Sequence, residues 1–344
     1  MEPITIKLIV AIAAIAIILI YWLKSKDTVS TEVLYSNALS ALINGNNTEA
    51  IKLLKQVVNQ DSDNIGAYLH LGNLLRLTNP HQSVKIHQSL TIRPKLSKLV
   101  INEIHHALAL DYTEMSNYNR AKIEADLVLK YDKSNLWANQ FLLQIAEIQH
   151  DWDRSAELAV KIQKLTGKKD MRRLAIIQLN AGNDQLKLGE NKKAMKRFQE
   201  AIILDPTFCT PYLHIGNIYE DENNLKKAII NWEKYLINEN DGDPQIYKKV
   251  KSALFDLGRF NEIEQFYSRI LVQKPNDKNA VVKLSNLLKE KGDIDRAIEI
   301  VDNAISQNND SIPARLMKIK ILLEKANPAD LNNQIDELID IIGK

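Results

Sequence analysis

The chain has 344 residues, 45% of them apolar, and its 45 basic and 43 acidic side chains give a net charge of +2. This balance argues against a broad nucleic-acid-binding surface, which needs an excess of basic residues on one face. The sole cysteine, Cys209, excludes an internal disulfide and a thiolate metal centre, and such sparse cysteine usage fits a reducing compartment.

Residues 1–26 are predicted to form a transmembrane anchor. Sixteen consecutive apolar residues run from Leu8 to Leu23, and counting from Ile4 extends the segment to 20 residues. At about 1.5 Å per residue, 20 helical residues span about 30 Å, the thickness of the hydrocarbon layer. An aromatic pair and two lysines at the end of this run are typical of a membrane interface. The candidate anchor residues are Leu8, Leu23, Tyr21, Trp22, Lys24 and Lys26.

The charges that flank this segment predict its orientation. Lys24 and Lys26 follow it, whereas the preceding flank carries Glu2 and Lys7, so the positive-inside rule places the C-terminal side in the cytoplasm. A cleaved signal peptide is the main alternative, but no small-residue cleavage site follows the apolar run. A buried core helix is a weaker alternative, because a repeat array would not surround it.

The region after a short polar linker is organised by a repeat of about 34 residues, which is clearest between residues 175 and 235. A shift of 34 aligns small residues with small residues and aromatic with aromatic. The aligned pairs include Gly182 and Gly216, Asn183 and Asn217, Ala194 and Ala228, and Phe198 and Trp232. This period with small residues at these offsets is the signature of the tetratricopeptide helix–turn–helix repeat. The small residues let paired helices approach closely, and Phe198 and Trp232 fill the space between them.

The same pattern extends in both directions, with turn residues at Gly189, Asn223, Gly258 and Gly292. We therefore predict an all-α chain: one N-terminal transmembrane helix, a right-handed superhelical solenoid of about eight tetratricopeptide repeats over residues 27–311, and capping helices over 312–344. The repeats are expected to begin near residues 31, 65, 102, 137, 175, 209, 244 and 278. Residues 166–170 form the most irregular break and suggest a bend between two half-arrays.

The last segment, residues 330–344, is predicted to be an amphipathic helix. Its apolar residues recur at helical spacing, at Leu331, Ile335, Leu338, Ile339 and Ile342. A cap that covers the exposed end of the array is the favoured interpretation, and a docking helix for a partner is the alternative.

Catalytic constellations are not recognisable in the sequence, so we predict a protein that is not an enzyme and that has no cofactor or metal. Neither a phosphate-binding GxxxxGK[ST] loop nor an HExxH motif is present. His105 and His106 are adjacent and should point to different sides of a helix, which prevents them from sharing a metal. His70 and His214 occupy the same repeat position and are expected to be packing residues or groove residues rather than metal ligands. His87 is interpreted as a partly buried packing histidine.

A protein-binding groove is the remaining candidate site. The first helices of tetratricopeptide repeats line the concave face, and the residue after the small position usually faces it. An amide at this position can pair with the backbone of an extended peptide. The alternative is that these asparagines have no binding role and are simply tolerated on a helix face. The candidate partner-binding residues are Tyr68, Asn73, Arg76, Asn183, Tyr212, Asn217, Glu220 and Asn286. The residue set of carboxylate-clamp repeats is not recognisable.

Two stretches resemble a specific family. Residues 67–76 with 85–90, including the Ile86-His87-Gln88 step, and residues 142–145 with 151–159 are similar to the second and fourth repeats of the lipopolysaccharide assembly protein B family of Gram-negative bacteria. The resemblance implies an inner-membrane protein with cytoplasmic repeats. Such proteins are adaptors that regulate lipid A synthesis by promoting degradation of the pathway's deacetylase by a membrane-bound AAA+ zinc protease, so both enzymes are implied partners.

One departure from the family pattern affects these expectations. The family ends in a rubredoxin-like knuckle with two CxxC pairs, whereas Cys209 is the only cysteine here, so no metal function carries over. The chain is thus a shortened member or a relative with a different client, and residues 330–344 are suggested to cover the surface that the knuckle would occupy. A general scaffold for cell-envelope assembly, facing the periplasm if the topology is reversed, is the alternative function. An enzyme is a third class, which no residues support.

Overall fold

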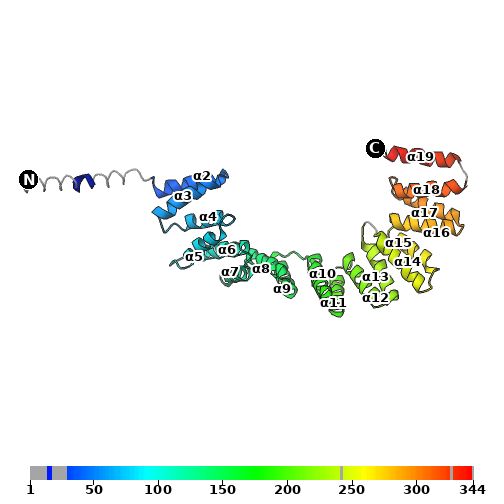
Figure 1. Ribbon diagram of the computed structural model, residues 1–344, viewed down its shortest axis with the longest axis horizontal. Helices are drawn as coiled ribbons and strands as arrows, with labels where there is room; N and C mark the ends of the chain where they lie inside the picture. Colours follow the sequence, from blue (N-terminus) through cyan, green and yellow to red (C-terminus); the bar gives the residue numbers. More distant parts are fainter. Residues whose placement is uncertain (1–13, 18–28, 241–242, 326–327, 343–344) are drawn as a thin grey trace, which may run out of the picture. The chain divides into compact units, whose positions relative to one another are not determined.

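The computed structural model describes residues 14–17, 29–240, 243–325 and 328–342, and every regular element in these ranges is a helix (Figure 1). The candidate anchor residues Leu8, Tyr21, Trp22, Leu23, Lys24 and Lys26 lie outside them. Within the described part of the chain, no helix combines the length and the apolar character needed to cross a bilayer.

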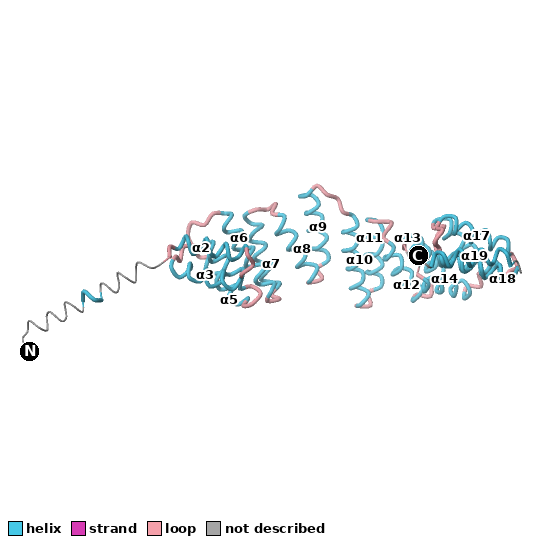
Figure 2. The backbone as a smooth tube through the Cα atoms, turned by 90° about the horizontal axis from the view of Figure 1, so that it is seen from above, coloured by secondary structure: helices cyan, strands magenta, loops and turns pink. Residues whose placement is uncertain are grey.

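Helices follow one another with short connections along the chain (Figure 2). They are α2 (Thr31–Ile43), α3 (Asn47–Gln60), α4 (Ile65–Leu75), α5 (Pro80–Thr91), α6 (Lys98–Glu114), α7 (Tyr118–Tyr131), α8 (Leu136–Ile148), α9 (Trp152–Thr166), α10 (Met171–Lys187), α11 (Asn191–Leu204), α12 (Cys209–Asp221), α13 (Leu225–Asn238), α14 (Pro244–Asp256), α15 (Glu262–Gln273), α16 (Lys278–Glu290), α17 (Ile294–Gln307), α18 (Ile312–Lys325) and α19 (Pro328–Ile342).

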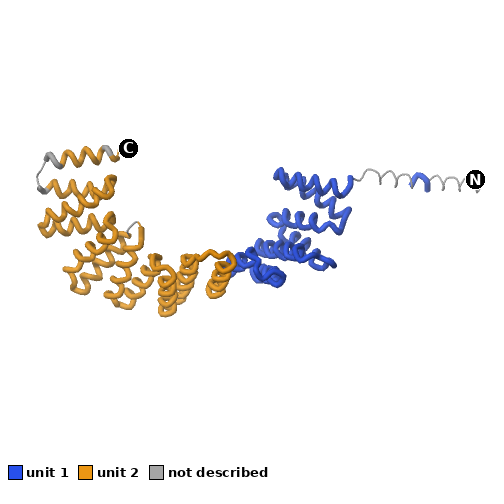
Figure 3. Tube along the Cα trace, turned by 180° about the vertical axis from the view of Figure 1, so that it is seen from behind, with its two compact units in different colours: residues 1–149 blue, residues 150–344 orange. Residues whose placement is uncertain are grey.

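Two compact units divide the chain, residues 1–149 and residues 150–344 (Figure 3). The division falls between α8 and α9, the two helices of the fourth repeat, and so precedes the break at residues 166–170. At that break Gly167 adopts a φ of 70° just after α9, and the Asp170 side chain accepts a hydrogen bond from the Arg173 N–H to begin α10. The break therefore separates two repeats within the second unit.

Seven of the eight first helices begin directly after a residue whose side chain caps them, and α12 is the exception. Helices α2, α4, α12, α14 and α16 begin at the residues expected from the repeat period, and α8 begins one residue earlier. Helices α6 and α10 begin four residues earlier than expected, at starts where the side chains of Ser97 and Asp170 accept hydrogen bonds from backbone N–H groups of the first turns. A capped start adds one helical turn that the apolar period does not reveal.

Residues with a left-handed backbone connect the two helices of a repeat. The turn series expected from the sequence has this conformation throughout: φ is 75° at Gly189, 55° at Asn223, 69° at Gly258 and 84° at Gly292. Glycine adopts positive φ at little cost, and asparagine tolerates it better than most residues. The regular spacing of these four residues therefore reflects a backbone requirement of the hairpins from α10–α11 to α16–α17, whereas the connection between α4 and α5 has no such residue.

Close helix approach explains the small residues of the fifth and sixth repeats. A Cβ added to Gly182 would lie 2.5 Å from the Phe198 ring, and one added to Gly216 would lie 2.5 Å from the Trp232 ring. Both aromatic side chains are fully buried. The predicted pairing of a small residue on the first helix with an aromatic residue on the second is confirmed.

The last two helices are joined by a buried arginine. Arg315 of α18 donates to Glu337 of α19, and its Nε donates to the Asn309 carbonyl oxygen at 2.9 Å. Leu338 is buried, whereas Ile339 is 61% exposed. The predicted apolar positions of α19 therefore do not share one environment. Of those five, Leu331 is half-buried, Leu338 is buried, and Ile335, Ile339 and Ile342 are exposed.

Candidate functional site

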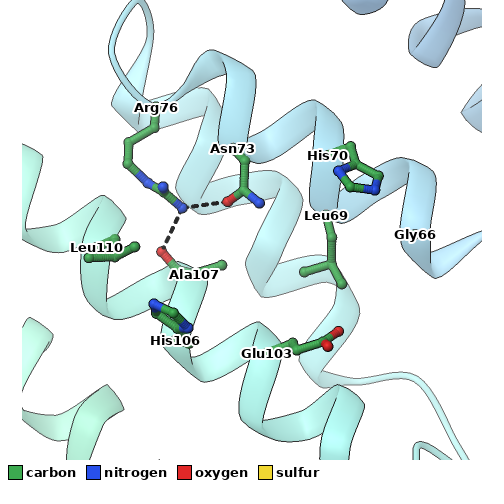
Figure 4. A pocket seen from close by; sticks show the side chains of 9 residues that line it. All are labelled: Gly66, Leu69, His70, Asn73, Arg76, Glu103, His106, Ala107 and Leu110. Carbon is green, nitrogen blue, oxygen red and sulfur yellow. Dashed lines mark hydrogen bonds between the residues drawn. The ribbon is translucent and has the colours of Figure 1, made fainter. Parts of the chain in front are cut away.

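A pocket of about 390 Å³ lies between α4 and α6, the first helices of the second and third repeats (Figure 4). Leu69, His70 and Asn73 line it from α4, and Glu103 and His106 line it from α6. We call the surface formed by the first helices of successive repeats the groove face. The pocket combines apolar walls with polar groups at several positions, as binding sites commonly do.

Arg76 is the fixed cation of this pocket. Its Nη2 donates to Asn73 Oδ1 at 2.5 Å and to the Ala107 carbonyl oxygen at 3.3 Å, as Figure 4 shows. Its Nε donates to Asp111 Oδ1 at 2.7 Å. The structure thus brings Asn73 and Arg76 together, as predicted for neighbours on one helix, and adds an acidic partner from α6 that sequence reasoning missed.

The Asp111 carboxylate is completely buried and is the centre of a polar network. Besides Arg76, it accepts from Ser83 Oγ at 2.8 Å and from His87 Nδ1 at 2.6 Å, both on α5. The other imidazole nitrogen of His87 lies 3.3 Å from the Leu69 carbonyl oxygen. A buried carboxylate requires such partners, because an unpaired charge inside a protein is strongly destabilising.

His87 occupies the place that an aromatic residue has in later repeats. A Cβ added to Gly72 would lie 2.3 Å from His87 Nε2, just as glycines of the fifth and sixth repeats meet Phe198 and Trp232. The sequence predicts a partly buried packing histidine here, and the structure shows a completely buried one that also forms hydrogen bonds. The Ile86-His87-Gln88 step therefore marks a repeat with a polar residue in its centre.

Aromatic contacts extend the groove face from α6 to α8. The His106 ring lies 3.7 Å from the Trp137 ring, which in turn lies 5.0 Å from the Phe141 ring. Burial and, secondarily, the Arg76 charge lower the pKa of His106 below its ordinary value, which favours the neutral imidazole at pH 7. Neither His106 nor Trp137 was predicted as a site residue. A contact between aromatic rings of two different repeats has no short sequence motif that would indicate it.

A second polar cluster lies on the groove face of the second unit. Lys249 of α14 donates to Asn217 Oδ1 at 3.1 Å and to Glu220 Oε2 at 2.5 Å, both on α12. Trp232 Nε1 also donates to Asn217 Oδ1, at 3.1 Å. The structure thus unites the predicted residues Asn217 and Glu220 through a lysine of the next repeat.

The remaining predicted asparagines have different environments. Asn286 Oδ1 accepts from Lys320 Nζ of the following first helix at 3.0 Å, so it repeats the contact between asparagine and lysine seen at Asn217. Asn183 Oδ1 is buried and has no hydrogen-bond partner among the described residues. Among the four predicted asparagines, Asn183 is thus the one whose side-chain oxygen accepts no hydrogen bond within the described part of the chain.

The two predicted tyrosines are engaged within the protein. Tyr68 carries the Arg93 guanidinium over its ring, 4.4 Å from the centroid. Tyr212 is only 8% exposed, and its hydroxyl donates to the Pro206 carbonyl oxygen at 3.4 Å. Tyr212 is therefore a core residue rather than an exposed groove contact.

The other histidines pack largely as the sequence predicts. His105 Nδ1 lies 2.7 Å from Glu124 Oε2, while His106 faces Trp137, so the two adjacent rings point to different neighbours. His70 lines the pocket, and His214 stacks on Phe198 with centroids 4.9 Å apart. Across the described residues, no group of three or more His, Cys, Asp or Glu side chains is arranged to hold a metal ion.

No protein-family model matches the chain, but curated relatives are found. Lipopolysaccharide assembly protein B of Escherichia coli (strain K12) is 19% identical over 258 residues, which are 75% of this chain and 66% of that protein. The Haemophilus influenzae protein of the same name is 24% identical over 286 residues, 78% of this chain and 70% of that protein. The chain is a tetratricopeptide repeat protein similar to lipopolysaccharide assembly protein B.

The chain matches just under two thirds of the length of the Escherichia coli relative. Among solved structures, a tetratricopeptide repeat protein from Parabacteroides merdae is 14% identical, with a TM-score of 0.39 and coverage of 71% of this chain and 93% of that one. Together with the helical hairpins described above, the similarity to lipopolysaccharide assembly protein B supports a scaffold for protein interactions.

Proposed function

We propose that the protein is a membrane-anchored adaptor that binds a client enzyme on its groove face and presents it to a membrane AAA+ protease, thereby regulating lipid A synthesis. The lipid A pathway deacetylase is the proposed client, and the bacterial inner membrane, with the repeats on the cytoplasmic side, is the proposed location. The similarity to lipopolysaccharide assembly protein B supports this biology.

The pocket between α4 and α6 is the observation that carries the proposed binding role. Arg76 is held there by Asp111, so its guanidinium is already ordered before a client arrives. Prior ordering reduces the entropy lost on binding, and a few fixed anchors supply most of the affinity in protein interfaces. The amide of Asn73 and the rings of His106 and Trp137 add polar and aromatic contacts beside this cation.

Site-specific photocrosslinking in native membranes tests this proposal. A photoreactive amino acid replaces Glu103, an exposed residue that lines the pocket, and the matched control replaces Asp126, an exposed residue on α7. We expect the deacetylase or the protease to be captured from position 103 and not from position 126. Capture of other envelope proteins alone from position 103 would favour the general scaffold and would remove the adaptor proposal.

The anchor is tested separately, since most of residues 1–26 lie outside the described residues. A chain without residues 1–23 should lose capture of a membrane protease while keeping its helical circular dichroism. A reporter fused at residue 30 should be active only as a cytoplasmic reporter. Alkaline phosphatase activity at this position would contradict the proposed orientation.

A further inference from the structure

A second pocket, of about 310 Å³, lies where α5 connects to α6. Arg93 and Lys95 of the connection line it, together with Ile101 and His105 of α6. These α6 residues face away from the α4–α6 pocket, because Glu103, His106 and Leu110 are displaced from them by about half a helical turn. The second pocket is therefore distinct from the groove site.

Arg93 lies in this pocket, and no carboxylate of the described residues forms an ion pair with it. Its guanidinium covers the Tyr68 ring, and its Nη1 is buried with no hydrogen-bond partner among the described residues. A buried charged donor without an acceptor is costly, and native proteins usually satisfy such groups with protein, water or an ion. An anion in the pocket would give the guanidinium the counter-charge that the described residues do not supply.

The charges around Arg93 favour the same kind of ligand. Lys95 adds a second cation, and no carboxylate is among the residues that line the pocket. The nearby Glu124 carboxylate lies 2.7 Å from the His105 ring, so it already has a partner. The pocket therefore presents positive charge that the surrounding protein leaves unneutralised.

Apolar side chains form the rest of the pocket. Leu96, Ile101, Ile104 and Tyr131 line it, and Ile104 is almost completely buried. These walls suit a hydrocarbon group next to the anion better than a fully hydrated ion. A carboxylate also matches the planar fork of a guanidinium in shape and charge.

We propose that this pocket binds a carboxylate carried beside an apolar side chain, presented by a protein partner. The carboxylate pairs with Arg93 in the field of Lys95, and the apolar side chain lies against Ile101 and Tyr131. The site is separate from the groove, so its occupancy can be measured whether or not the adaptor function holds.

Methyl NMR on the purified full-length chain tests the pocket with two small probes of nearly equal shape. N-acetyl-leucine carries the carboxylate, and N-acetyl-leucinamide replaces it with a neutral amide. We expect the acid to shift the methyl signals of Ile101 and Ile104 in a saturable way and to bind roughly tenfold or more tightly than the amide, as a charge-assisted hydrogen bond predicts. Equal binding of acid and amide would overturn the proposal.

Variants and a third probe complete the test. Arg93→Gln should weaken binding of the acid roughly tenfold or more, whereas Lys55→Gln, which removes an exposed lysine on α3, should not. Unchanged affinity in Arg93→Gln would refute the role of the guanidinium. Inorganic phosphate that competes as strongly as the acid would refute the apolar part of the site. If Arg93→Gln fails to fold, the comparison of acid and amide binding to the unaltered chain still tests whether the pocket binds a carboxylate.

Discussion

The second repeat and the sixth repeat solve the same packing problem with opposite chemistry. In both, a glycine on the first helix leaves room for a large ring from the second: His87 beside Gly72, and Trp232 beside Gly216. Both rings are completely buried. The Trp232 ring is held mainly by apolar packing, whereas the His87 ring needs the buried carboxylate of Asp111.

This difference links the interior to the surface more extensively in the first unit than in the second. Asp111 contacts the buried His87 on one side and Arg76, which lines the groove pocket, on the other. The polar centre of the second repeat therefore also positions a candidate binding residue. In the sixth repeat the link is weaker, since only the Trp232 ring nitrogen reaches Asn217 on the groove face.

Removing the apolar ring should have the largest effect. Trp232→Ala should lower the free energy of unfolding by about 4 kcal/mol, because it leaves a cavity where a large ring was fully buried. Denaturant unfolding followed by circular dichroism measures this loss. Phe255→Ala, at an exposed aromatic residue of α14, is the control and should change stability far less.

Removing the buried carboxylate should come next. Asp111→Asn should cost about 3 kcal/mol, since His87 and Arg76 lose their shared anion inside the protein. Client capture at the groove pocket should fall as well, because Arg76 loses its fixed position. Asp126→Asn, at an exposed site on α7, should change neither stability nor client capture. Equal effects of the two substitutions would show that the Asp111 network contributes to neither.

A pH-dependent contribution of about 2 kcal/mol is expected from the second unit. Burial raises the pKa of Asp184, but hydrogen bonds from His150, Lys187 and Trp152 outweigh it and lower the pKa from 3.8 to about 2. The stabilisation is present above pH 4 and is lost as pH falls towards 2, because the unfolded state binds the proton first. Urea unfolding between pH 2 and 6 should show this slope, and Asp184→Asn should reduce it.

The smallest expected effect is the coupling energy between His87 and Asp111. It tests whether the polar pair of the second repeat can be replaced by apolar side chains like those of the sixth. His87→Phe and Asp111→Leu should each destabilise the chain, and the double variant should be more stable than the sum of the single effects predicts, by about 1 kcal/mol. Removing both polar partners avoids leaving either one unsatisfied. Strict additivity in this double-mutant cycle would contradict direct coupling between His87 and Asp111.

Local sequence rules predicted the repeats because each rule acts within one helical hairpin. Gly189, Asn223, Gly258 and Gly292 are spaced by the repeat period because each turn requires a positive φ. Gly182 with Phe198 likewise shows a close helix crossing inside one repeat. The extra first turns of α6 and α10 were missed, since a capping side chain can begin a helix before the apolar period starts.

Among the predicted site residues, the direct contact in the structure joins two close neighbours in the sequence, and their role in partner binding stays a prediction. Arg76 is the C-terminal capping residue of α4 and follows Asn73 by three positions, so their contact follows from helix geometry. Asp111, Trp137 and Lys249 reach the groove face from the next repeat, and their partners lie 24 to 35 residues away in the sequence.

The sequence by itself determined an array of helical hairpins with small residues at the crossings, since period, turn and packing residues lie within one repeat. Only the tertiary structure decided which polar groups meet between repeats. In the sequence, Asp111 is one of three acidic residues of α6, and nothing local distinguishes it from the other two. Its burial against His87 and Arg76 depends on how α4, α5 and α6 stack, and that stacking is set by the summed packing of three helices.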